Sequence, residues 1–362
     1  MGLKRISLHL TCMSETIPHE SYMQRCLQLA LLGTGQVAPN PLVGSVLVHN
    51  NRIIGEGYHQ QFGAAHAEVH CIESVSEQDK NLIADSTLYV NLEPCSHFGK
   101  TPPCVDFIKQ HQIQKVVVGC KDFSSKVNGK GIALLREHGV EVLEGVLENE
   151  SKHLNRRFFY FENRRLPYVI LKWAESADGF IGKANQSLKI SNIFSDRLVH
   201  QWRAEESAIM VGYRTALQDN PQLNVRLAKG KNPVRMVFDR DLSLPSTCHL
   251  FDQSQRTIVF NYLIEKSDGV IEFIKILPDN EIEQMLEILG NKQVSSLLVE
   301  GGAKCLQKMV NANQWNEARI IKSNEYLYNG IVGPHLQNAE IIKQMHIQTD
   351  QITFFNNYTH NL

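Results

Sequence analysis

The sequence predicts an α/β protein of two domains. At 362 residues the chain exceeds what one hydrophobic core usually organises, and its 43% apolar and 21% charged residues are typical of a globular protein. Through residue 148, short apolar runs of strand length alternate with segments of helical periodicity. That alternation is typical of a mixed sheet between two layers of helices. We therefore expect an N-terminal αβα sandwich, a boundary near residue 150 and a second α/β domain.

Charge and hydropathy oppose several classes of protein. With 37 basic and 38 acidic residues, the chain shows no basic excess of the kind that nucleic acid attracts, so a small substrate is favoured. The longest apolar runs, residues 115–120 and 295–299, are strand-sized and too short to span a membrane. Residues 1–15 lack a signal-peptide pattern and are expected to form an N-terminal extension, with Met13 as an alternative start. Eight cysteines without close spacing favour a reducing cytoplasm.

The elements of the first domain, residues 16–148, follow from periodicity and turn residues. Helical spacing over residues 19–32 ends at two glycines. Asn50 and Asn51 join the expected strands 43–49 and 52–58 into a hairpin. Beyond the hairpin we expect helices over residues 68–75 and 105–111, and strands over residues 87–92 and 116–119.

Three metal-binding side chains and one free carboxylate occur in order within residues 66–104. His66 is followed two positions later by Glu68, and Cys95 and Cys104 come further along. An imidazole with two thiolates is typical of a catalytic zinc site, in which three protein ligands leave a fourth position for water. The metal would lower the pKa of that water, and Glu68 would be free to transfer protons. We therefore predict that His66, Cys95 and Cys104 bind Zn²⁺.

The spacing of the two cysteines decides how specific this pattern is. The motif H-x-E followed by P-C-x-x-C is typical of zinc deaminases, whose Glu acts as general acid and base. Here the eight residues 96–103 separate Cys95 from Cys104, where the common form has two. Either half of the pattern alone would be better explained by a helix histidine or by ordinary buried thiols. Both halves together, with a proline before each cysteine, favour zinc.

Basic and aromatic residues interleave between residues 147 and 165, where the composition changes. Four aromatic residues in a row, from Phe158 to Phe161, have arginines on both sides. Such a segment could bind nucleic acid, but a helix that packs its aromatic side chains between two domains is the favoured interpretation. We expect a linker helix over residues 149–166, at the start of a second domain that covers residues 149–362.

Two glycine-bearing turns in the second domain could receive a phosphate group. An expected strand over residues 295–300 leads through Gly301 and Gly302 into an expected helix over residues 303–310, and Val211 with Gly212 repeats this arrangement. Such turns let a pyrophosphate approach backbone N–H groups at a helix start. One turn of this kind is common in proteins, whereas two in one domain favour a dinucleotide. The G-x-G-x-x-G fingerprint of a Rossmann domain does not occur, so we do not expect that fold.

Several motifs together resemble the bifunctional riboflavin-biosynthesis deaminase/reductase family. In the first domain they begin at Asn40 (NPLVG), Gly57 (GYH), His66 (HAEVH) and Glu93 (EPCSHFGKTPPC). In the second domain they begin at Leu171 (LKWAESADG), Val211 (VGYRT), Asp219 (DNPQLNVR) and Glu300 (EGG). The long insert between the two cysteines is normal in this family, and it separates the chain from cytidine and tRNA-adenosine deaminases.

The resemblance implies a fold and two reactions. The first domain would be a cytidine-deaminase-like αβα sandwich, and the second a dihydrofolate-reductase-like α/β domain. The first would use Zn²⁺ to deaminate a diamino-ribosylamino-pyrimidinone 5′-phosphate, and the second would use NADPH to reduce the ribosyl side chain to ribityl. The enzyme would be cytoplasmic, would bind neither nucleic acid nor membrane, and would form a homo-oligomer, either a dimer or a tetramer.

The resemblance also implies roles for individual residues. Glu68, Lys172 and Asp219 would be catalytic, with the Lys and the Asp as a proton-handling pair beside Glu300. Asn40 would contact the pyrimidine, and arginines would hold the sugar phosphate. The implied substrate contacts are Asn40, His59, His97, Lys100, Ser191, Arg203, Leu223, Arg226 and Glu300. The implied NADPH contacts are Ala174, Val211, Gly212, Thr215, Gly301 and Gly302.

Two other functions remain open at this point. An editing deaminase of nucleic acid with an unrelated C-terminal domain would share the metal ligands, although the neutral charge opposes it. Salt-independent activity on a free nucleotide would argue against that alternative. A structural zinc module joined to a scaffold domain would also share the ligands, but it would not need Glu68. Replacing Glu68 by Gln would separate that alternative from an enzyme.

Overall fold

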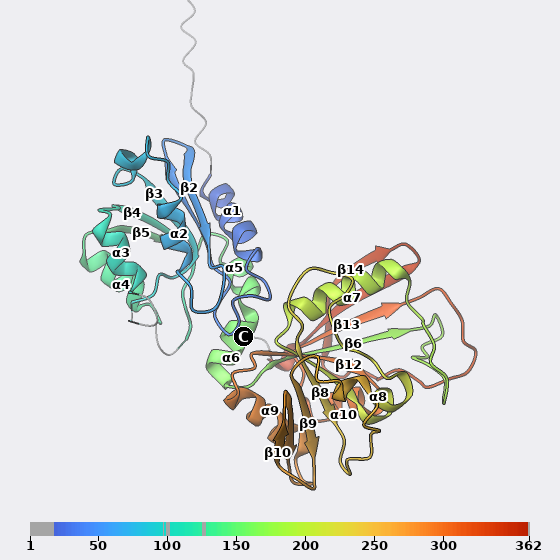
Figure 1. The fold of residues 1–362 in the computed structure, drawn as a ribbon. Helices are drawn as coiled ribbons and strands as arrows, with labels where there is room; N and C mark the ends of the chain where they lie inside the picture. The colour runs from blue at the N-terminus through green and yellow to red at the C-terminus, as the bar shows by residue number, and fades with distance from the viewer. Residues whose placement is uncertain (1–17, 97, 99–101, 125–127, 361–362) are drawn as a thin grey trace, which may run out of the picture.

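The computed structural model describes residues 18–96, 98, 102–124 and 128–360, and it arranges them around two sheets (Figure 1). We call the chain up to residue 147 the first half and the chain from residue 168 the second half. The expected N-terminal extension, residues 1–15, lies outside the described residues. The predicted substrate contacts His97 and Lys100 lie outside them as well.

The first sheet has five strands in the order β2-β1-β3-β4-β5. β1 pairs antiparallel with β2 and with β3, whereas β3, β4 and β5 run parallel to one another. The strands are β1 (Gly44–His49), β2 (Arg52–Tyr58), β3 (Thr87–Leu92), β4 (Lys115–Cys120) and β5 (Glu141–Glu144). The sheet is therefore mixed, as the sequence predicted.

Helices cover both faces of this sheet. The helices are α1 (His19–Leu31), α2 (Ala67–Glu73), α3 (Cys104–Gln110) and α4 (Lys130–Glu137), with a short 3₁₀ helix η1 (Lys80–Leu82). On one face Met23 and Cys26 of α1 pack against Val46 and Tyr89 of the sheet. On the other face α2, α3 and α4 bury their apolar sides in a second cluster, to which Leu88 contributes from the sheet. The predicted αβα sandwich is confirmed.

The segment between the sheets forms two helices instead of the single linker helix that the sequence predicted. α5 (Glu148–Leu154) and α6 (Arg156–Arg164) are separated by Asn155, whose backbone is not helical. The Asn155 side chain accepts a hydrogen bond from the Leu42 N–H at 2.8 Å and donates one to the Leu42 carbonyl at 3.0 Å. An asparagine that binds another backbone in this way favours a helix end over a helix interior. The break therefore ties the linker to the first half.

The second sheet has ten strands in the order β10-β11-β9-β8-β7-β12-β6-β13-β15-β14. The seven strands from β11 to β13 in that order are parallel, and antiparallel strands flank them on both sides. The strands are β6 (Tyr168–Glu175), β7 (Ala208–Gly212), β8 (Val234–Phe238), β9 (Thr257–Asn261), β10 (Lys266–Asp268), β11 (Ile271–Lys275), β12 (Ser296–Gly301), β13 (Glu317–Lys322), β14 (Ala339–Ile347) and β15 (Asp350–Asn357).

Four helices cover the second sheet. They are α7 (Ile193–Glu205), α8 (Tyr213–Asp219), α9 (Glu281–Asn291) and α10 (Ala303–Asn311), and two short 3₁₀ helices are η2 (His249–Phe251) and η3 (Tyr358–His360). α7 and α8 pack Val199, Trp202 and Ala216 on one face. α9 and α10 pack Leu286 and Leu306 on the other. Both faces of the parallel strands are thereby buried, as such strands require.

The first half and the linker meet the second half where β7 and β12 begin. Gly35 approaches so closely that a Cβ there would lie 2.1 Å from the carbonyl oxygen of Ala204, at the end of α7. Arg157 of α6 donates two hydrogen bonds to Glu206, just before β7, at 2.5 and 2.9 Å. A small cavity of about 60 Å³ in this region is lined from both halves, and Ser296 at the start of β12 is in its wall. The contact between the halves therefore lies at the amino ends of these strands.

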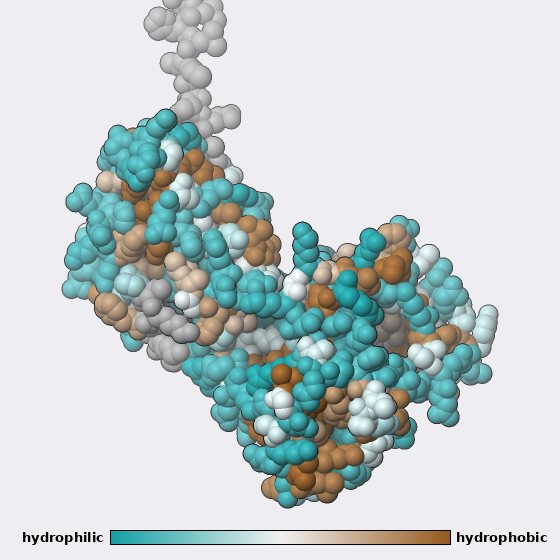
Figure 2. Space-filling model, viewed as in Figure 1, coloured by the Kyte–Doolittle hydropathy of each residue, from teal (hydrophilic) through white to brown (hydrophobic). Residues whose placement is uncertain are grey.

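Most strands and helices that the sequence predicted occur within one or two residues of the expected bounds, among them β2, β3 and α10. Within the described residues, no helix is long and apolar enough to cross a membrane. The face in Figure 2 is mainly hydrophilic over both halves, with smaller hydrophobic patches between.

Candidate active sites

The three predicted metal ligands lie together in the first half, although the first and the last are 38 positions apart in the sequence. His66 is the N-cap residue of α2, and Cys104 is the first residue of α3. Cys95 follows β3 by three residues. Buried apolar residues on α2 and α3 hold both helices against the sheet, and this packing fixes where the helices start. The ligands are therefore brought together by the packing of the fold.

The distances between the ligand atoms fit a zinc ion. His66 Nδ1 lies 3.2 Å from Cys104 Sγ and 3.5 Å from Cys95 Sγ, and all three ligand atoms lie within 4.8 Å of one another. Tetrahedral zinc with bonds of about 2.0–2.3 Å places its ligand atoms roughly 3.3–3.8 Å apart. The pKa of Cys95 is lowered, because the hydrogen bond from the Cys104 thiol and the bond with His66 outweigh burial. A thiolate at Cys95 is the form that binds a metal.

Glu68 lies beside these ligands and is almost fully buried, with 3% of its surface exposed. Burial raises the pKa of its carboxyl, and the neighbouring His66 opposes that rise with a smaller effect. Glu68 stands in the first turn of α2, two residues after the ligand His66. It is not part of the metal-ligand group of His66, Cys95 and Cys104. A carboxyl group in such a place can carry protons next to a bound metal.

Two predicted substrate contacts, Asn40 and His59, bind each other next to this site. The Nδ1 of His59 lies 3.0 Å from the carbonyl oxygen of Ala65, so this nitrogen carries the proton and donates. The Nε2 of His59 is then an acceptor for the Asn40 amide N–H at 3.1 Å. Burial lowers the pKa of His59, which favours this neutral form. The His59 ring also stands edge-on to the ring of His66, with centroids 5.5 Å apart.

In the second half, Lys172 and Arg203 converge on the carboxylate of Glu300. Arg203 donates two hydrogen bonds to it at 2.7 and 2.8 Å, and Lys172 Nζ lies 3.7 Å away. Burial lowers the pKa of Lys172, although Glu300 opposes this. Burial alone would raise the pKa of Glu300, but the charges of Arg203 and Lys172 outweigh it and lower that pKa to about 2. The three side chains come from α7, β6 and β12.

The two glycine turns lie at the carboxyl ends of the neighbouring strands β7 and β12. Val211 pairs with Gly301 across these strands, and Gly212 and Gly302 are the N-cap residues of α8 and α10. Gly302 has a φ of 79°, and a Cβ there would lie 3.1 Å from Thr215 Oγ1. Glycine at position 302 therefore permits the left-handed backbone and leaves the space next to Thr215 free of a side chain. This arrangement fits a dinucleotide phosphate, with Ala174 nearby in the sheet on β6.

The remaining predicted residues of the second half lie in two places: Asp219, Leu223 and Arg226 belong to one segment, and Ser191 precedes α7. Asp219 and Arg226 are exposed, and Leu223 is buried. Asp219 and Lys172, which were predicted to act as a pair, are not paired in this structure. The Asp219 carboxylate forms no hydrogen bond or ion pair with any described residue. Ser191 donates a hydrogen bond to Asp196 at 3.1 Å.

One residue near this segment was not predicted from the sequence. His200 of α7 is buried, and its Nδ1 accepts a hydrogen bond from the Arg226 backbone N–H at 3.2 Å. Burial lowers the pKa of His200 to about 4, so the ring is neutral and can accept. A lone histidine in a helix gives no sequence signal for this role.

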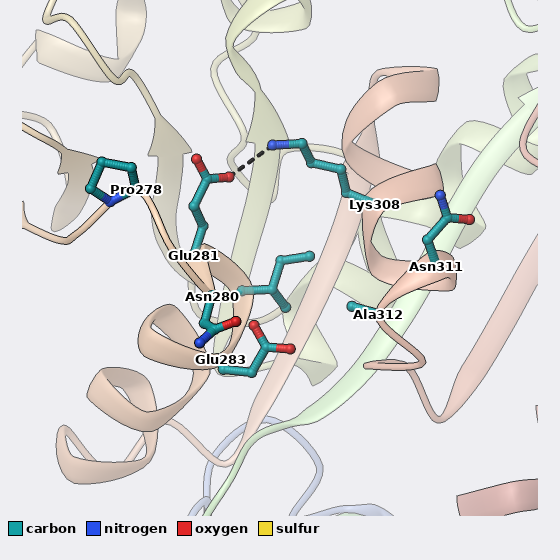
Figure 3. A pocket seen from close by; sticks show the side chains of 8 residues that line it. Pro278, Asn280, Glu281, Glu283, Lys308, Asn311 and Ala312 are labelled. Atoms are coloured by element: carbon teal, nitrogen blue, oxygen red, sulfur yellow. Dashed lines mark hydrogen bonds and ion pairs between the residues drawn. The ribbon is translucent and has the colours of Figure 1, made fainter.

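A further hollow of about 430 Å³ lies between α9 and α10 (Figure 3). Figure 3 shows Glu281 and Lys308 facing each other across it, and their charged groups form an ion pair at 2.8 Å. Among the described residues, none of the predicted catalytic, metal or cofactor residues lines this hollow.

The fold and the metal site of the first half indicate a zinc-dependent deaminase, and the family match of the second half indicates a reductase joined to it. Residues 16–120 match the family of the cytidine and deoxycytidylate deaminase zinc-binding region, and residues 167–323 match the RibD C-terminal domain. The chain belongs to the riboflavin biosynthesis protein RibD family. The RibD protein of Bacillus amyloliquefaciens is 37% identical over 349 residues, which cover 92% of this chain and 93% of that protein.

Solved structures agree with this assignment. A protein of Thermotoga maritima has a TM-score of 0.86 and 35% identity, and the match covers 93% of this chain and 98% of that one. It is described as a diaminohydroxyphosphoribosylaminopyrimidine deaminase and 5-amino-6-(5-phosphoribosylamino)uracil reductase. Acinetobacter baumannii RibD has a TM-score of 0.84 with 29% identity over 93% of this chain and 98% of that one. The chain is thus a bifunctional riboflavin-biosynthesis enzyme that uses Zn²⁺ and NADPH.

Proposed function

We propose that this chain removes an amine from a diamino-ribosylamino-pyrimidinone 5′-phosphate and then reduces the ribosyl group of the product to ribityl. The observation that carries the first step is the group of three metal-ligand atoms beside the buried Glu68. The Thermotoga maritima relative is described by two activities on substrates of this kind, and the match spans nearly the whole chain. The same two reactions are therefore proposed here.

In the deamination, His66, Cys95 and Cys104 hold zinc, which when bound supplies a Lewis acid that lowers the pKa of water. Glu68 accepts the proton of the attacking water and delivers it to the departing amine, so that water and amine become a ring carbonyl and ammonia. The short distance along α2 between His66 and Glu68 supports this division of roles.

The pyrimidine is held by Asn40, which His59 orients. The Asn40 amide N–H is committed to His59, so its amide oxygen faces away and can accept a hydrogen bond from a ring N–H. His59 fixes the orientation of the Asn40 side chain through this hydrogen bond. Because the His59 ring is neutral, it adds no positive charge beside the metal site. His97 and Lys100 stay predicted contacts of the 5′-phosphate.

In the reduction, NADPH when bound would supply the hydride. Opening of the sugar leaves its first carbon joined to the amine nitrogen as an imine, so this carbon would receive the hydride and the nitrogen would need a proton. Lys172 is the proposed donor of this proton, because its buried ammonium group has a lowered pKa and gives up a proton more readily. Glu300 keeps Lys172 and Arg203 in place and can also bind a sugar hydroxyl.

Other residues of the second half complete the site. We propose that Val211, Gly212, Thr215, Gly301 and Gly302 hold the cofactor phosphates, since their backbones converge at the ends of two adjacent strands. Further proposed contacts are Ala174 for NADPH, and Ser191, Leu223, Arg226 and the Arg203 guanidinium for the sugar phosphate. Asp219 is proposed to act as a proton-handling partner of Lys172 once ligands bind, since it stands at the end of α8 close in sequence to Leu223.

We also propose the division of the chain into a deaminase domain, residues 16–148, and a reductase domain, residues 149–362, working in the cytoplasm as a homo-oligomer. The edge strand β14 supports an association between copies, because Ile341 and Ile342 are 56% and 42% exposed on it. Light scattering of the purified chain tests this. A lysine in place of Ile341 should then lower the mass, and a monomeric parent chain would contradict the proposal.

The function is tested with the ribosylamino-pyrimidine 5′-phosphate as substrate, by following zinc content, ammonia release and NADPH oxidation in one preparation. Asp219→Asn should lose NADPH oxidation and keep ammonia release, because the altered residue belongs to the second half. Loss of both activities in this variant would contradict independent domains. Ammonia release that persists after zinc is removed by a chelator would contradict the proposed deamination.

A further inference from the structure

The carboxylate of Glu93 has an unusual set of partners for a residue next to a metal ligand. It stands directly after β3 and two residues before Cys95, and it is 4% exposed. Its Oε2 accepts hydrogen bonds from the backbone N–H groups of Asp122 at 3.0 Å and Gly129 at 3.1 Å. Its Oε1 accepts from Gly131 at 2.8 Å and Ile132 at 3.2 Å. Four backbone donors from another part of the chain therefore meet on one carboxylate.

These four bonds use the full accepting capacity of Glu93. A carboxylate offers about four lone-pair positions, and two N–H groups on each oxygen fill them. Glu93 therefore has no free lone pair with which to bind a metal, and it is not among the three clustered ligands. Its role must act through the residues that it holds.

The clamp joins the start of α4 to the metal-binding turn. Gly129 is the N-cap residue of α4, in the left-handed region with a φ of 84°, and no side chain of its own segment caps the helix. The first N–H groups of a helix lack partners within the helix, and Glu93 supplies them from outside. Bonds to a charged acceptor are roughly twice as strong as neutral ones. The end of β3 and the start of α4 are thus fixed to each other.

A steric contact holds the same junction from the other side. A Cβ on Gly131 would lie 2.0 Å from the carbonyl oxygen of Pro94, so only glycine lets α4 approach so closely. Pro94 is therefore confined between Glu93, which is clamped, and Cys95, whose carbonyl accepts the Val105 N–H at 3.3 Å. The backbone of the turn is restrained on both sides of Pro94.

We propose that Glu93 is a positioning residue for the zinc site: by clamping α4 it sets the place of the Cys95 sulfur before the metal arrives. The inference rests on the proposed ligand set of His66, Cys95 and Cys104. Groups that orient a ligand from behind typically change metal affinity 10- to 100-fold when they are altered. The bonds of Glu93 go to backbone groups, so the effect should pass through the backbone of the turn.

The test uses the full-length chain with Glu93→Gln, which keeps the shape and turns two of the four acceptor positions into donors. Zinc release to a chromogenic chelator, zinc content at fixed free zinc, ammonia release and NADPH oxidation are measured together. We expect zinc to bind about 10- to 100-fold more weakly, ammonia release to recover at saturating zinc, and NADPH oxidation to match the parent chain. A helix cap with a folding role alone would lower the melting temperature and leave zinc affinity unchanged.

Two further variants keep the inference decidable. Gly131→Ala keeps the Glu93 side chain but pushes on Pro94, and its Cβ would also lie 3.2 Å from Glu93 Oε1. It should therefore disturb the same clamp and weaken zinc binding too, and it decides the question if Glu93→Gln does not fold. Asp239→Asn is the matched control, because this buried carboxylate accepts the Ser243 and Leu244 N–H groups in the second half. It should leave zinc release and ammonia release as in the parent chain.

The outcomes separate this inference from the function on which it rests. Cys95→Ser should lose zinc, and zinc binding as in the parent chain would overturn the proposed ligand set. If Cys95→Ser loses zinc while Glu93→Gln and Gly131→Ala release it at the parent rate, only the inference about Glu93 is overturned. Ammonia release by Glu93→Gln that stays low when its zinc site is saturated would overturn it as well.

Discussion

Replacing Glu300 by Gln should make NADPH oxidation fail at a lower pH, because it removes the negative charge that helps to keep Lys172 protonated. Lys172 Nζ lies 3.7 Å from Glu300 Oε2, and the two side chains are only 12% and 6% exposed. At an effective dielectric constant of about 20, two unit charges at this distance attract each other by about 4 kcal/mol. Glutamine keeps the shape and removes this attraction. Arg203 keeps its positive charge nearby, which lowers the pKa of Lys172 further.

The sign of the effect on pH dependence follows from these contacts. Burial lowers the pKa of Lys172 in the parent chain, and Glu300 partly restores it. If the protonated lysine is the active form, NADPH oxidation is lost as the pH rises through this pKa. In Glu300→Gln the pKa falls, so the loss should begin at a lower pH. The assay is kcat/KM for NADPH oxidation across the pH range in which the parent enzyme is stable.

A matched control and the other activity make this test decisive. Glu287 is an exposed carboxylate on α9, and Glu287→Gln should leave the profile in place. Ammonia release should stay at the parent level in both variants, because the first half does not contain Glu300. An alkaline limb that stays where it is, or moves to higher pH, in Glu300→Gln would refute the reasoning about Lys172.

Three further predictions concern single contacts. Glu68→Gln should keep zinc and lower ammonia release by about 10²- to 10⁴-fold, with NADPH oxidation unchanged, and ammonia release near the parent rate would exclude its proton-carrying role. Arg157→Met leaves the buried Glu206 without its bidentate partner and should lower the free energy of unfolding, measured by urea denaturation, by about 3–5 kcal/mol. The same substitution should lower it by less in a chain that already carries Glu206→Gln, and an equal decrease in both chains would show that the two side chains do not interact. His200→Leu removes the acceptor of the Arg226 N–H and should raise KM for the sugar phosphate substrate. His200→Asn, which keeps an acceptor, should bring KM part of the way back to the parent value. An unchanged KM in His200→Leu would contradict the proposed contact.

The zinc group could be predicted from the sequence because its chemistry leaves few alternatives. An imidazole and two thiols with a spare carboxylate have few common uses together. The structure brings His66, Cys95 and Cys104 within 4.8 Å, although the ligand roles themselves stay a prediction until zinc is measured. The Asn40 to His59 contact was not foreseen, because both residues were assigned separately to the substrate.

The second half was less predictable because its sites depend on strand order. β12 follows β11 in the chain but lies between β7 and β6 in the sheet, and this brings Glu300 beside Lys172 and Arg203. No local pattern encodes such an insertion. The hairpin of β14 and β15 was also missed. The break at Asn155 was missed because helical periodicity continues across it, and only the bonds to Leu42 explain the interruption.

The place where the halves meet has a consequence for traffic between the two reactions. The first half touches the second where β7 and β12 begin, whereas the glycine turns stand where these strands end. Six residues of β12 span roughly 20 Å of packed sheet between the two ends. A molecule released by the first site of one chain would have to travel around that sheet to reach the second. Fusion of the two halves gives every chain one site of each kind, at different ends of the second sheet.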